Sequence, residues 1–472
     1  MSQQNNERLE SDSIGERYIP ADAYFGVQSW RAKENFHITG QQIHPAMIRS
    51  LAYIKKACAL ANRRAGVLSE EKAGAIITAC NKLLTGKYHD QFIVDPIQGG
   101  AGTSLNMNAN EVVANVAIED LGGTLGDYSV VHPNDDVNRG QSTNDVIPTA
   151  GKLCTLMLLD KLYPALDNLI AAFRKKGTEF DDIIKMGRTQ LQDAVPIRLG
   201  QEFNAYATAI ERCVKRIKVA ATEMTSINMG GTAIGTGVNA DPYYYSHIAE
   251  DLAKLTGFPF EQARDLIDAT QNIDSFAAVS SALKDCALAL SKIANDLRLM
   301  SSGPRTGLEE ISLPAKQNGS SIMPGKVNPV IPEVVSQIAF RVMGNDVTVS
   351  MAVEAGQLEL NAFEPVVFYS LFQSIDILRE GAITFRMNCV EGIEANKEQC
   401  LQLLKMSAGI VTALAPYIGY AKAAKLAKES LARNIPVAEL AKAHNYLSEE
   451  QLNKVLDPYK MTAPEEQPKV KE

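Results

Sequence analysis

Apolar residues recur every three or four positions through most of the chain, and this spacing predicts long amphipathic helices. The clearest run spans 273–300, with apolar positions at Ile273, Phe276, Val279, Leu283, Ala287, Leu290, Ile293, Leu297 and Met300. At 1.5 Å per residue, a continuous helix there is about 40 Å long. Similar runs predict helices over 149–178, 197–225, 329–352 and 364–389. Patterns typical of strands are few and short, so we expect a mainly α fold.

Long helices joined by Gly- and Pro-containing loops predict an elongated bundle with more apolar surface than one chain can bury, so we expect self-association. The pattern divides the chain into a mostly helical N-terminal domain (1–141), a central long-helix bundle (142–395) and a small helical C-terminal domain (396–472). Other segments are predicted as follows: 1–45 polar and irregular; helices within 45–86 and over 110–121, 398–405, 421–433 and 437–444; and a solvated tail over 462–472.

Composition and charge narrow the class of protein. The 472 residues are 46% hydrophobic and 22% charged, as in an ordinary globular protein, and the net charge is −8. Because no basic stripe is present, we expect neither nucleic acid nor an anionic membrane as a partner. The seven cysteines are scattered, which predicts reduced thiols. With a polar N-terminus and no apolar run of about 20 residues, we expect a cytoplasmic location.

The loop Gly319–Pro329, with sequence GSSIMPGKVNP, is the strongest candidate for chemistry. Its two glycines and two prolines predict a loop that can close over a ligand. A helix should begin near Asn328, with Asn328 as its cap and Pro329 in the first turn. The positive helix N-terminus, together with Lys326 and Asn328, predicts a carboxylate-binding site beside Ser320 and Ser321. A surface turn before a helix is the alternative.

Three further loops carry hydroxyl and amide groups, and each is expected to precede a long helix. Their candidate residues are Thr103, Ser142, Thr143, Asn144, Thr189 and Gln190. Taken singly, such residues are common helix caps. Together with Lys326 they predict a site in which neutral donors and one cation bind a small polyoxygenated anion. His132 fits either a turn or a secondary anion contact.

Several common kinds of site are excluded by spacing. The chain has no Walker A loop, no dinucleotide-binding fingerprint and no Gly-x-Ser-x-Gly elbow. Its six histidines lack the spacing of metal ligands, so no dedicated transition-metal site is expected.

The segment GSSIMPGKVNPVIPE resembles the signature of the aspartase/fumarase superfamily of lyases. Four other segments resemble that superfamily in the same order: GGAGTSLNMNANEVVAN, VHPNDDVNRGQSTNDVIPT, MGRTQLQDAVPIRLGQEF and NMGGTAIGTG. The resemblance spans nearly the whole chain. It implies a three-domain, mainly α fold whose long central helices form the shared core of a homotetramer, with active sites where three subunits meet.

Within the superfamily, MGRTQLQDAVP and QGGAGTSLNMN are most similar to aspartate ammonia-lyases. This implies reversible anti-elimination of ammonia from L-aspartate to give fumarate, without a cofactor; activation by divalent cations is left open. By resemblance, Ser320 removes a Cβ proton and leaves an aci-carboxylate. The implied binding roles are Thr103, Ser142, Thr143 and Ser321 on the β-carboxylate, Lys326, Asn328, Thr189 and Gln190 on the α-carboxylate, and Asn144 with Thr103 facing the amino group.

Four residues have secondary roles by resemblance. His132, Asn134 and Asp135 match an anion-binding segment of fumarases. Glu333 occupies the position that, in a hydratase, pairs with a histidine, and this chain has Gln190 in place of that histidine.

Two alternatives remain. The first is a class II fumarate hydratase, against which Gln190 argues. The second is a lyase-fold protein kept for structure or binding, as some lens crystallins are. The match of Ser320, Lys326, Asn328 and Thr189 to the superfamily pattern argues against it.

Overall fold

The computed structural model describes residues 6–464, so most of the predicted tail over 462–472 lies outside the described residues. The chain forms two compact units, each assembled from three segments. Unit 1 contains the chain up to Tyr163, Lys215–Asp285 and Phe340–Leu378; unit 2 contains Pro164–Val214, Cys286–Ala339 and the chain from Arg379 onward. The predicted domain boundaries at residues 141 and 395 stay a prediction.

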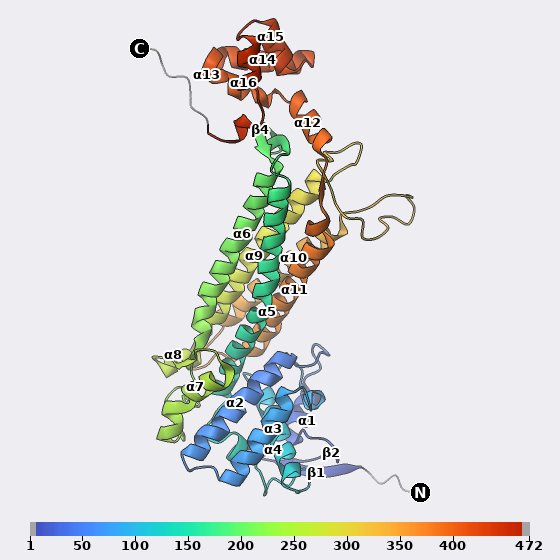
Figure 1. Ribbon diagram of the computed structural model, residues 1–472. Coiled ribbons are helices and arrows are strands. Elements are labelled where there is room, and N and C mark those ends of the chain that lie inside the picture. The colour runs from blue at the N-terminus through green and yellow to red at the C-terminus, as the bar shows by residue number, and fades with distance from the viewer. Residues whose placement is uncertain (1–5, 465–472) are drawn as a thin grey trace. The chain divides into compact units, whose positions relative to one another are not determined.

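Five long helices dominate the structure and continue from one unit into the other (Figure 1). They are α5 (Thr143–Glu179), α6 (Leu199–Ala221), α9 (Asp274–Met300), α10 (Val330–Glu354) and α11 (Glu364–Asn388). Their bounds lie within six residues of the predicted ones, and all nine apolar positions predicted for 273–300 are buried. The predicted mainly α class is confirmed.

Specific contacts join these helices within each unit. In unit 1, the Lys284 ammonium on α9 lies 2.6 Å from the Asp346 carboxylate on α10. Close packing there also requires a small residue, because a side chain at Gly151 on α5 would overlap the ring of Phe368 on α11. In unit 2, the Tyr206 hydroxyl on α6 donates to Asp296 on α9 at 3.1 Å.

Unit 1 also contains a group of shorter helices: α2 (Pro45–Arg64), α3 (Glu70–Leu84), α4 (Thr103–Asp120), α7 (Pro242–Thr256) and α8 (Leu266–Gln271). Helix α2 packs against α3 and α7, and α3 packs against α4. In the same unit, the short strands β5 (Ser226–Ile227) and β6 (Glu261–Gln262) pair in parallel.

The prediction that residues 1–45 are irregular is wrong. Strands β1 (Glu7–Asp12) and β2 (Gly15–Pro20) pair antiparallel, with Leu9 opposite Tyr18, and helix α1 follows at Val27–Asn35. The two strands, ERLESD and GERYIP, are mostly charged and polar and lack the apolar alternation that identifies a strand from sequence.

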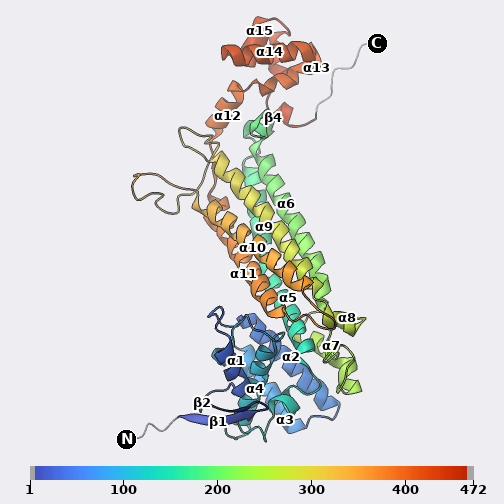
Figure 2. The ribbon, with the colours of Figure 1, turned by 180° about the vertical axis from the view of Figure 1, so that it is seen from behind.

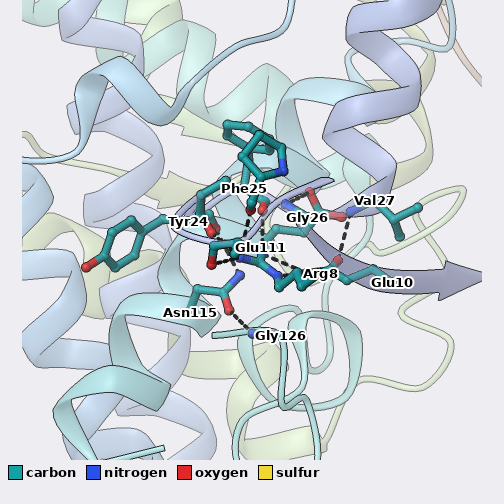
Figure 3. A network of polar contacts seen from close by, with 12 residues as sticks. Arg8, Glu10, Tyr24, Phe25, Gly26, Val27, Glu111, Asn115 and Gly126 are labelled. Atoms are coloured by element: carbon teal, nitrogen blue, oxygen red, sulfur yellow. Dashed lines mark hydrogen bonds and ion pairs between the residues drawn. The ribbon is translucent and has the colours of Figure 1, made fainter. Parts of the chain in front are cut away.

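Helix α1 has its N-terminus capped by carboxylates from elsewhere in the chain (Figure 3). Its N-cap residue is Gly26, and the Glu111 carboxylate on α4 accepts from the backbone N–H groups of Gly26 and Gln28, both at 2.9 Å. The Glu10 carboxylate accepts from Val27 N–H at 2.9 Å. Burial raises the pKa of Glu111 to about 7. This cap depends on tertiary contacts alone.

Unit 2 has two small antiparallel sheets: β3 (Ile184–Thr189) with β4 (Gln192–Arg198), and β7 (Ile311–Ser312) with β8 (Glu394–Ala395). The helices after residue 396 are α12 (Lys397–Met406), α13 (Ala415–Ile418), α14 (Tyr420–Arg433), α15 (Val437–Ala443) and α16 (Glu449–Val455). Helices α13, α14 and α15 lie close together (Figure 2). Residues of these C-terminal helices, including Leu404, Leu426 and Leu440, form one apolar cluster. Met186 of β3 belongs to the same cluster, so it fixes the β3–β4 hairpin to these helices.

The described residues also form short 3₁₀ helices: η1 (His89–Gln91), η3 (Thr222–Thr225), η4 (Val390–Gly392), η5 (Ala408–Leu414) and η6 (Lys460–Thr462).

Between residues 6 and 464, no single helix has both the length and the apolar composition to cross a bilayer; the bent pair Lys397–Met406 and Ala408–Ile418 meets the two criteria only when taken together.

Candidate active site

The segment Ser142–Asp145 forms the N-terminus of α5 in unit 1. The Ser142 hydroxyl oxygen accepts from Asn144 N–H at 3.2 Å, and the Asp145 carboxylate accepts from Ser142 N–H at 2.9 Å. Ser142 is therefore a helix cap, as its residue type predicts. Burial raises the pKa of Asp145 to about 6.

The Gly-rich segment Asn228–Gly237 packs against this helix N-terminus. The Asn144 side-chain amide donates to the carbonyl oxygen of Ala233 at 2.7 Å, and the Asn228 amide donates to the carbonyl oxygen of Asn144 at 3.0 Å. The Asp145 carboxylate also accepts from Gly230 N–H at 3.2 Å and from Thr232 N–H at 3.1 Å. Two segments about 85 residues apart in sequence thus hold Asn144 in one orientation.

Thr103 is the first residue of α4, which begins seven residues before the predicted start at 110. Its side chain is exposed. Asn106, one turn further along the same face, donates to the Thr143 hydroxyl at 3.3 Å. The structure therefore brings the N-termini of α4 and α5, with Thr103 and Thr143, into one part of unit 1.

Lys55 on α2 is a residue of this region that the sequence analysis did not identify. It is fully buried, and its ammonium donates to three neutral side-chain oxygens, those of Asn106 (2.8 Å), Asn138 (2.9 Å) and Gln141 (2.9 Å). Burial lowers the pKa of Lys55 to about 8. The sequence signal for a buried lysine was its spacing: Lys55 follows Leu51 by four residues and so falls within the apolar stripe of α2.

His132 caps a local turn. Its Nδ1 accepts from Asn134 N–H at 3.2 Å and from Asp135 N–H at 3.1 Å, at the start of the π-helical turn η2 (Pro133–Val137). His132, Asn134 and Ser104 line a cleft of about 510 Å³ in unit 1. The lining of that cleft does not include Ser142, Thr143 or Asn144.

In unit 2, the segment Gly319–Asn328, termed the serine loop below, is closed at its base by two hydrogen bonds. Gly319 N–H donates to the carbonyl oxygen of Lys326 at 2.9 Å, and the Asn328 side-chain amide donates to the carbonyl oxygen of Gly319 at 2.6 Å. The prediction that Asn328 caps the next helix is wrong, because its amide closes the loop and α10 begins at Val330. Lys326 and Ser321 are exposed.

The Ser320 hydroxyl oxygen accepts from two backbone N–H groups of the serine loop, those of Ile322 at 3.2 Å and Met323 at 2.9 Å. Donors directed at an oxygen stabilise negative charge on it. The loop therefore supplies two of the groups that an ionised serine requires.

Thr189 and Gln190 lie at the tip of the β3–β4 hairpin, where the sequence analysis expected a loop leading directly into a helix. Thr189 pairs with Gln192, and the two turn residues between them, Gln190 and Leu191, have φ of 55° and 60°. Two left-handed residues form the type I′ turn of a tight hairpin, for which Asn-Gly is the usual sequence. The hairpin lacks that sequence, which explains why it was not predicted.

The predicted site residues are thus divided between the two units. Unit 1 holds Thr103, His132, Asn134, Asp135, Ser142, Thr143 and Asn144; unit 2 holds Thr189, Gln190, Ser320, Ser321, Lys326, Asn328 and Glu333. Glu333 lies in the first turn of α10. Among residues 6–464, no three His, Cys, Asp or Glu side chains lie together as metal ligands do. The roles assigned to all fourteen residues stay predictions.

Two family models match the chain. The model described as "Lyase" matches residues 15–344, and the one described as "Fumarase C C-terminus" matches residues 410–463. The aspartate ammonia-lyase of Bacillus subtilis (strain 168) is 54% identical to the chain, over 98% of the chain and 97% of that protein. The aspartate ammonia-lyase of Pseudomonas aeruginosa is 51% identical, over 98% of each.

Solved structures are similar over almost the whole chain. The Brucella melitensis protein described as "fumarate lyase:delta crystallin", in a cobalt-bound crystal, has a TM-score of 0.95 at 50% identity, covering 97% of this chain and 100% of that one. The class II fumarase of Schistosoma mansoni has a TM-score of 0.94 at 34% identity, covering 97% and 99%.

Proposed function

The chain belongs to the aspartase/fumarase superfamily of lyases, and we propose that it is an aspartate ammonia-lyase, a carbon–nitrogen lyase that converts L-aspartate reversibly to fumarate and ammonia. One observation carries the choice within the superfamily. The chain is 54% identical to an aspartate ammonia-lyase but 34% identical to a class II fumarase of nearly the same fold. Gln190, where fumarases have a histidine by resemblance, supports the same choice.

Ser320 is proposed as the base. Its alkoxide takes a proton from Cβ of L-aspartate, and the electron pair of that C–H bond moves into the β-carboxylate as a dianionic aci-carboxylate. The Cα–N bond then breaks as the pair returns to form the double bond, and ammonia leaves with the electrons of the C–N bond. The N–H groups of Ile322 and Met323, which already contact the Ser320 oxygen, lower the cost of ionising a weakly acidic hydroxyl.

The intermediate gains charge at the β-carboxylate, so donors directed there stabilise it more than they stabilise the substrate. Thr103, Ser142, Thr143 and Ser321 are proposed for this role. Lys326, Asn328, Thr189 and Gln190 are proposed to hold the α-carboxylate, whose charge does not change during the reaction. The side-chain oxygen of Asn144, with Thr103, is proposed to face the substrate amino group. The elimination proposed here uses no cofactor.

We further propose a homotetramer in which different subunits complete each active site. Phe340, Val347 and Met351 support it, because they lie seven and four residues apart on one face of α10 and expose 60%, 59% and 68% of their surface. Such an exposed apolar stripe is expected to be buried against another subunit. The division of the predicted site residues between units 1 and 2 is compatible with sites built from several subunits. We propose a cytoplasmic location, supported by seven scattered, buried cysteines.

The test is ultraviolet detection of fumarate from four substrates offered in parallel: L-aspartate, L-malate, argininosuccinate and adenylosuccinate. We expect fumarate from L-aspartate, and the reverse addition of ammonia to fumarate. Turnover of L-malate without turnover of L-aspartate would identify a fumarate hydratase instead. A folded tetramer that forms fumarate from none of the four would identify a protein kept for structure or binding.

A further inference from the structure

Helix α5 lacks one main-chain hydrogen bond near its N-terminus, because Pro148 lies within it. In a regular α-helix, the N–H of residue 148 would donate to the carbonyl oxygen of residue 144. Proline has no N–H, and its ring crowds the carbonyl group four residues before it. The carbonyl oxygen of Asn144 is therefore left without its helix donor, and main-chain carbonyls inside a protein are normally paired with another group.

Asn228, the first residue of the Gly-rich segment, supplies a donor from outside the helix. Its side-chain amide nitrogen donates to the carbonyl oxygen of Asn144 and to the Thr270 hydroxyl oxygen, both at 3.0 Å. The Thr149 hydroxyl donates to the side-chain oxygen of Asn228 at 3.4 Å. Because a carbonyl oxygen can only accept, the amide nitrogen of Asn228 has to face Asn144. Asn228 is buried, so these contacts are protected from water.

The main chain on both sides of Asn228 is fixed by the segment that contains strand β6. Ala263 N–H donates to the carbonyl oxygen of Ile227 at 2.8 Å, and the Gln262 side-chain amide donates to the carbonyl oxygen of Met229 at 3.1 Å. Ile227 and Met229 are both completely buried. Asn228 therefore reaches α5 from a well-supported position.

Asn144 is thus held at two points, both by the Gly-rich segment. Its carbonyl oxygen accepts from Asn228, and its side-chain amide nitrogen donates to the carbonyl oxygen of Ala233 at 2.7 Å. The Ala233 carbonyl can only accept, so it takes the amide nitrogen and turns the side-chain oxygen of Asn144 the other way. An oxygen held in one direction is a suitable acceptor for an ammonium group.

We propose that Asn228 is a positioning residue for the substrate amino group: its amide replaces the helix hydrogen bond that Pro148 cannot donate, and so fixes Asn144 with its side-chain oxygen toward the substrate. This inference rests on the proposed function, which assigns Asn144 to the amino group of L-aspartate. A misplacement of about 1 Å at a contact with the substrate can cost on the order of 100-fold in rate. A second support for Asn144 therefore has a direct catalytic value.

The test compares Asn228→Leu with Asn345→Leu. Both substitutions remove a buried amide that donates to a helix carbonyl oxygen, but Asn345 contacts that of Ser370 on α11, at 3.1 Å. KM for L-aspartate is measured beside the inhibition constant of succinate, which has two carboxylates and no amino group. We expect Asn228→Leu to raise KM about 10-fold and the succinate constant less than about 2-fold, because it weakens one hydrogen bond to a charged group.

Asn345→Leu should leave both constants unchanged. Equal rises of KM and of the succinate constant in Asn228→Leu would show a general loss of structure and would overturn the inference. Equal effects of the two variants on KM would overturn it as well.

Pro148→Ala supplies the missing donor directly. The N–H that this substitution introduces can donate to the carbonyl oxygen of Asn144, as in an uninterrupted helix. In the Asn228→Leu background, we expect Pro148→Ala to lower KM for L-aspartate back toward the parent value, whereas in the parent protein it should leave KM unchanged. A double variant that keeps the KM of Asn228→Leu would contradict the inference.

Melting temperatures supply a readout that does not require activity. We expect Pro148→Ala to raise the melting temperature more in the Asn228→Leu background than in the parent protein, because the two substitutions act on the same carbonyl oxygen. Equal shifts in both backgrounds would overturn the inference. A parent protein that forms no fumarate would contradict the proposed function, whereas the comparison of melting temperatures would still decide whether Asn228 replaces the helix hydrogen bond.

Discussion

The ammonium of Lys55 lies 2.9 Å from the side-chain oxygen of Gln141, the residue directly before Ser142. Its other two donors contact Asn106 and Asn138, and Asn106 in turn donates to Thr143. A buried positive charge, surrounded by neutral oxygens, thus lies next to the segment proposed to hold the β-carboxylate. Because the protein interior screens charge less than water does, a buried ammonium acts on negative charge over a longer distance than a surface lysine does. Lys55 should therefore stabilise the proposed dianionic intermediate.

Lys55→Met should lower kcat/KM for L-aspartate at pH 7 and change its pH dependence. The groups that face Lys55 are Cys58 on α2, Cys80 on α3 and Asp145 on α5, and burial brings the pKa of Lys55 to about 8. In the parent protein, kcat/KM should fall as pH rises through about 8, because Lys55 loses its charge. The variant should lack this step, whereas Lys56→Met at the adjacent position should keep it. An alkaline limb that is identical in the Lys55→Met variant would contradict the assignment.

The same group predicts a difference in stability with pH. The pKa of Lys55 is about 8 in the folded protein and 10.5 at its ordinary value, so the folded state releases the proton first. Between these two pH values the unfolded state binds more protons, and the Lys55 contribution to the free energy of unfolding rises with pH by about 1.4 kcal/mol per unit. Denaturant titrations at pH 7 to 10 should therefore show a parent-minus-Lys55→Met difference that grows above pH 8. A constant difference would argue against a depressed pKa.

Ser320→Ala should reduce kcat by about 10²–10⁴-fold, because it removes the proposed base. Binding of L-aspartate and the oligomeric state should be retained, since the Ser320 hydroxyl accepts its hydrogen bonds from the backbone of its own loop. Ser312→Ala, at the exposed position of strand β7, is the matched control and should keep normal turnover. Near-normal turnover in Ser320→Ala means that another group is the base.

Lys326→Ala should raise KM for L-aspartate by about 10–100-fold, the usual range for losing a hydrogen bond to a charged group. The effect on kcat should be smaller, because the α-carboxylate keeps its charge throughout the reaction. Lys316→Ala removes another exposed lysine from the same stretch of chain and should leave KM unchanged. If the two variants have the same KM, Lys326 is not the carboxylate anchor.

Met351→Glu should break the proposed tetramer, because it places a charge in the apolar stripe of α10. Light scattering after size exclusion should show smaller species, and fumarate formation should fall with them. Leu431→Glu on α14 changes a side chain of similar exposure, 71% against 68%, and should leave the assembly intact. A fully active monomer of the parent protein would contradict sites shared between subunits.

The spacing of apolar residues located the long helices well, because this spacing depends only on residues that are close in sequence. The apolar spacing over 273–300 needs no knowledge of the partner surface, and every predicted position there is buried. Elements without such a pattern were missed. The β1–β2 pair is mostly charged, and the β3–β4 hairpin turns at Gln190 and Leu191 without a turn sequence.

The sequence by itself determined the mainly α class, the approximate bounds of the five long helices and the residue types that a site for a small dianion requires. Tertiary structure decided how those residues are supported, because support comes from groups distant in sequence. Asn328 closes the serine loop instead of capping α10, Lys55 reaches Gln141 across 86 positions, and Glu310 pairs with Arg188 across 122. A helix follows from neighbouring residues, whereas the pairing of a buried charge depends on which distant chain folds against it.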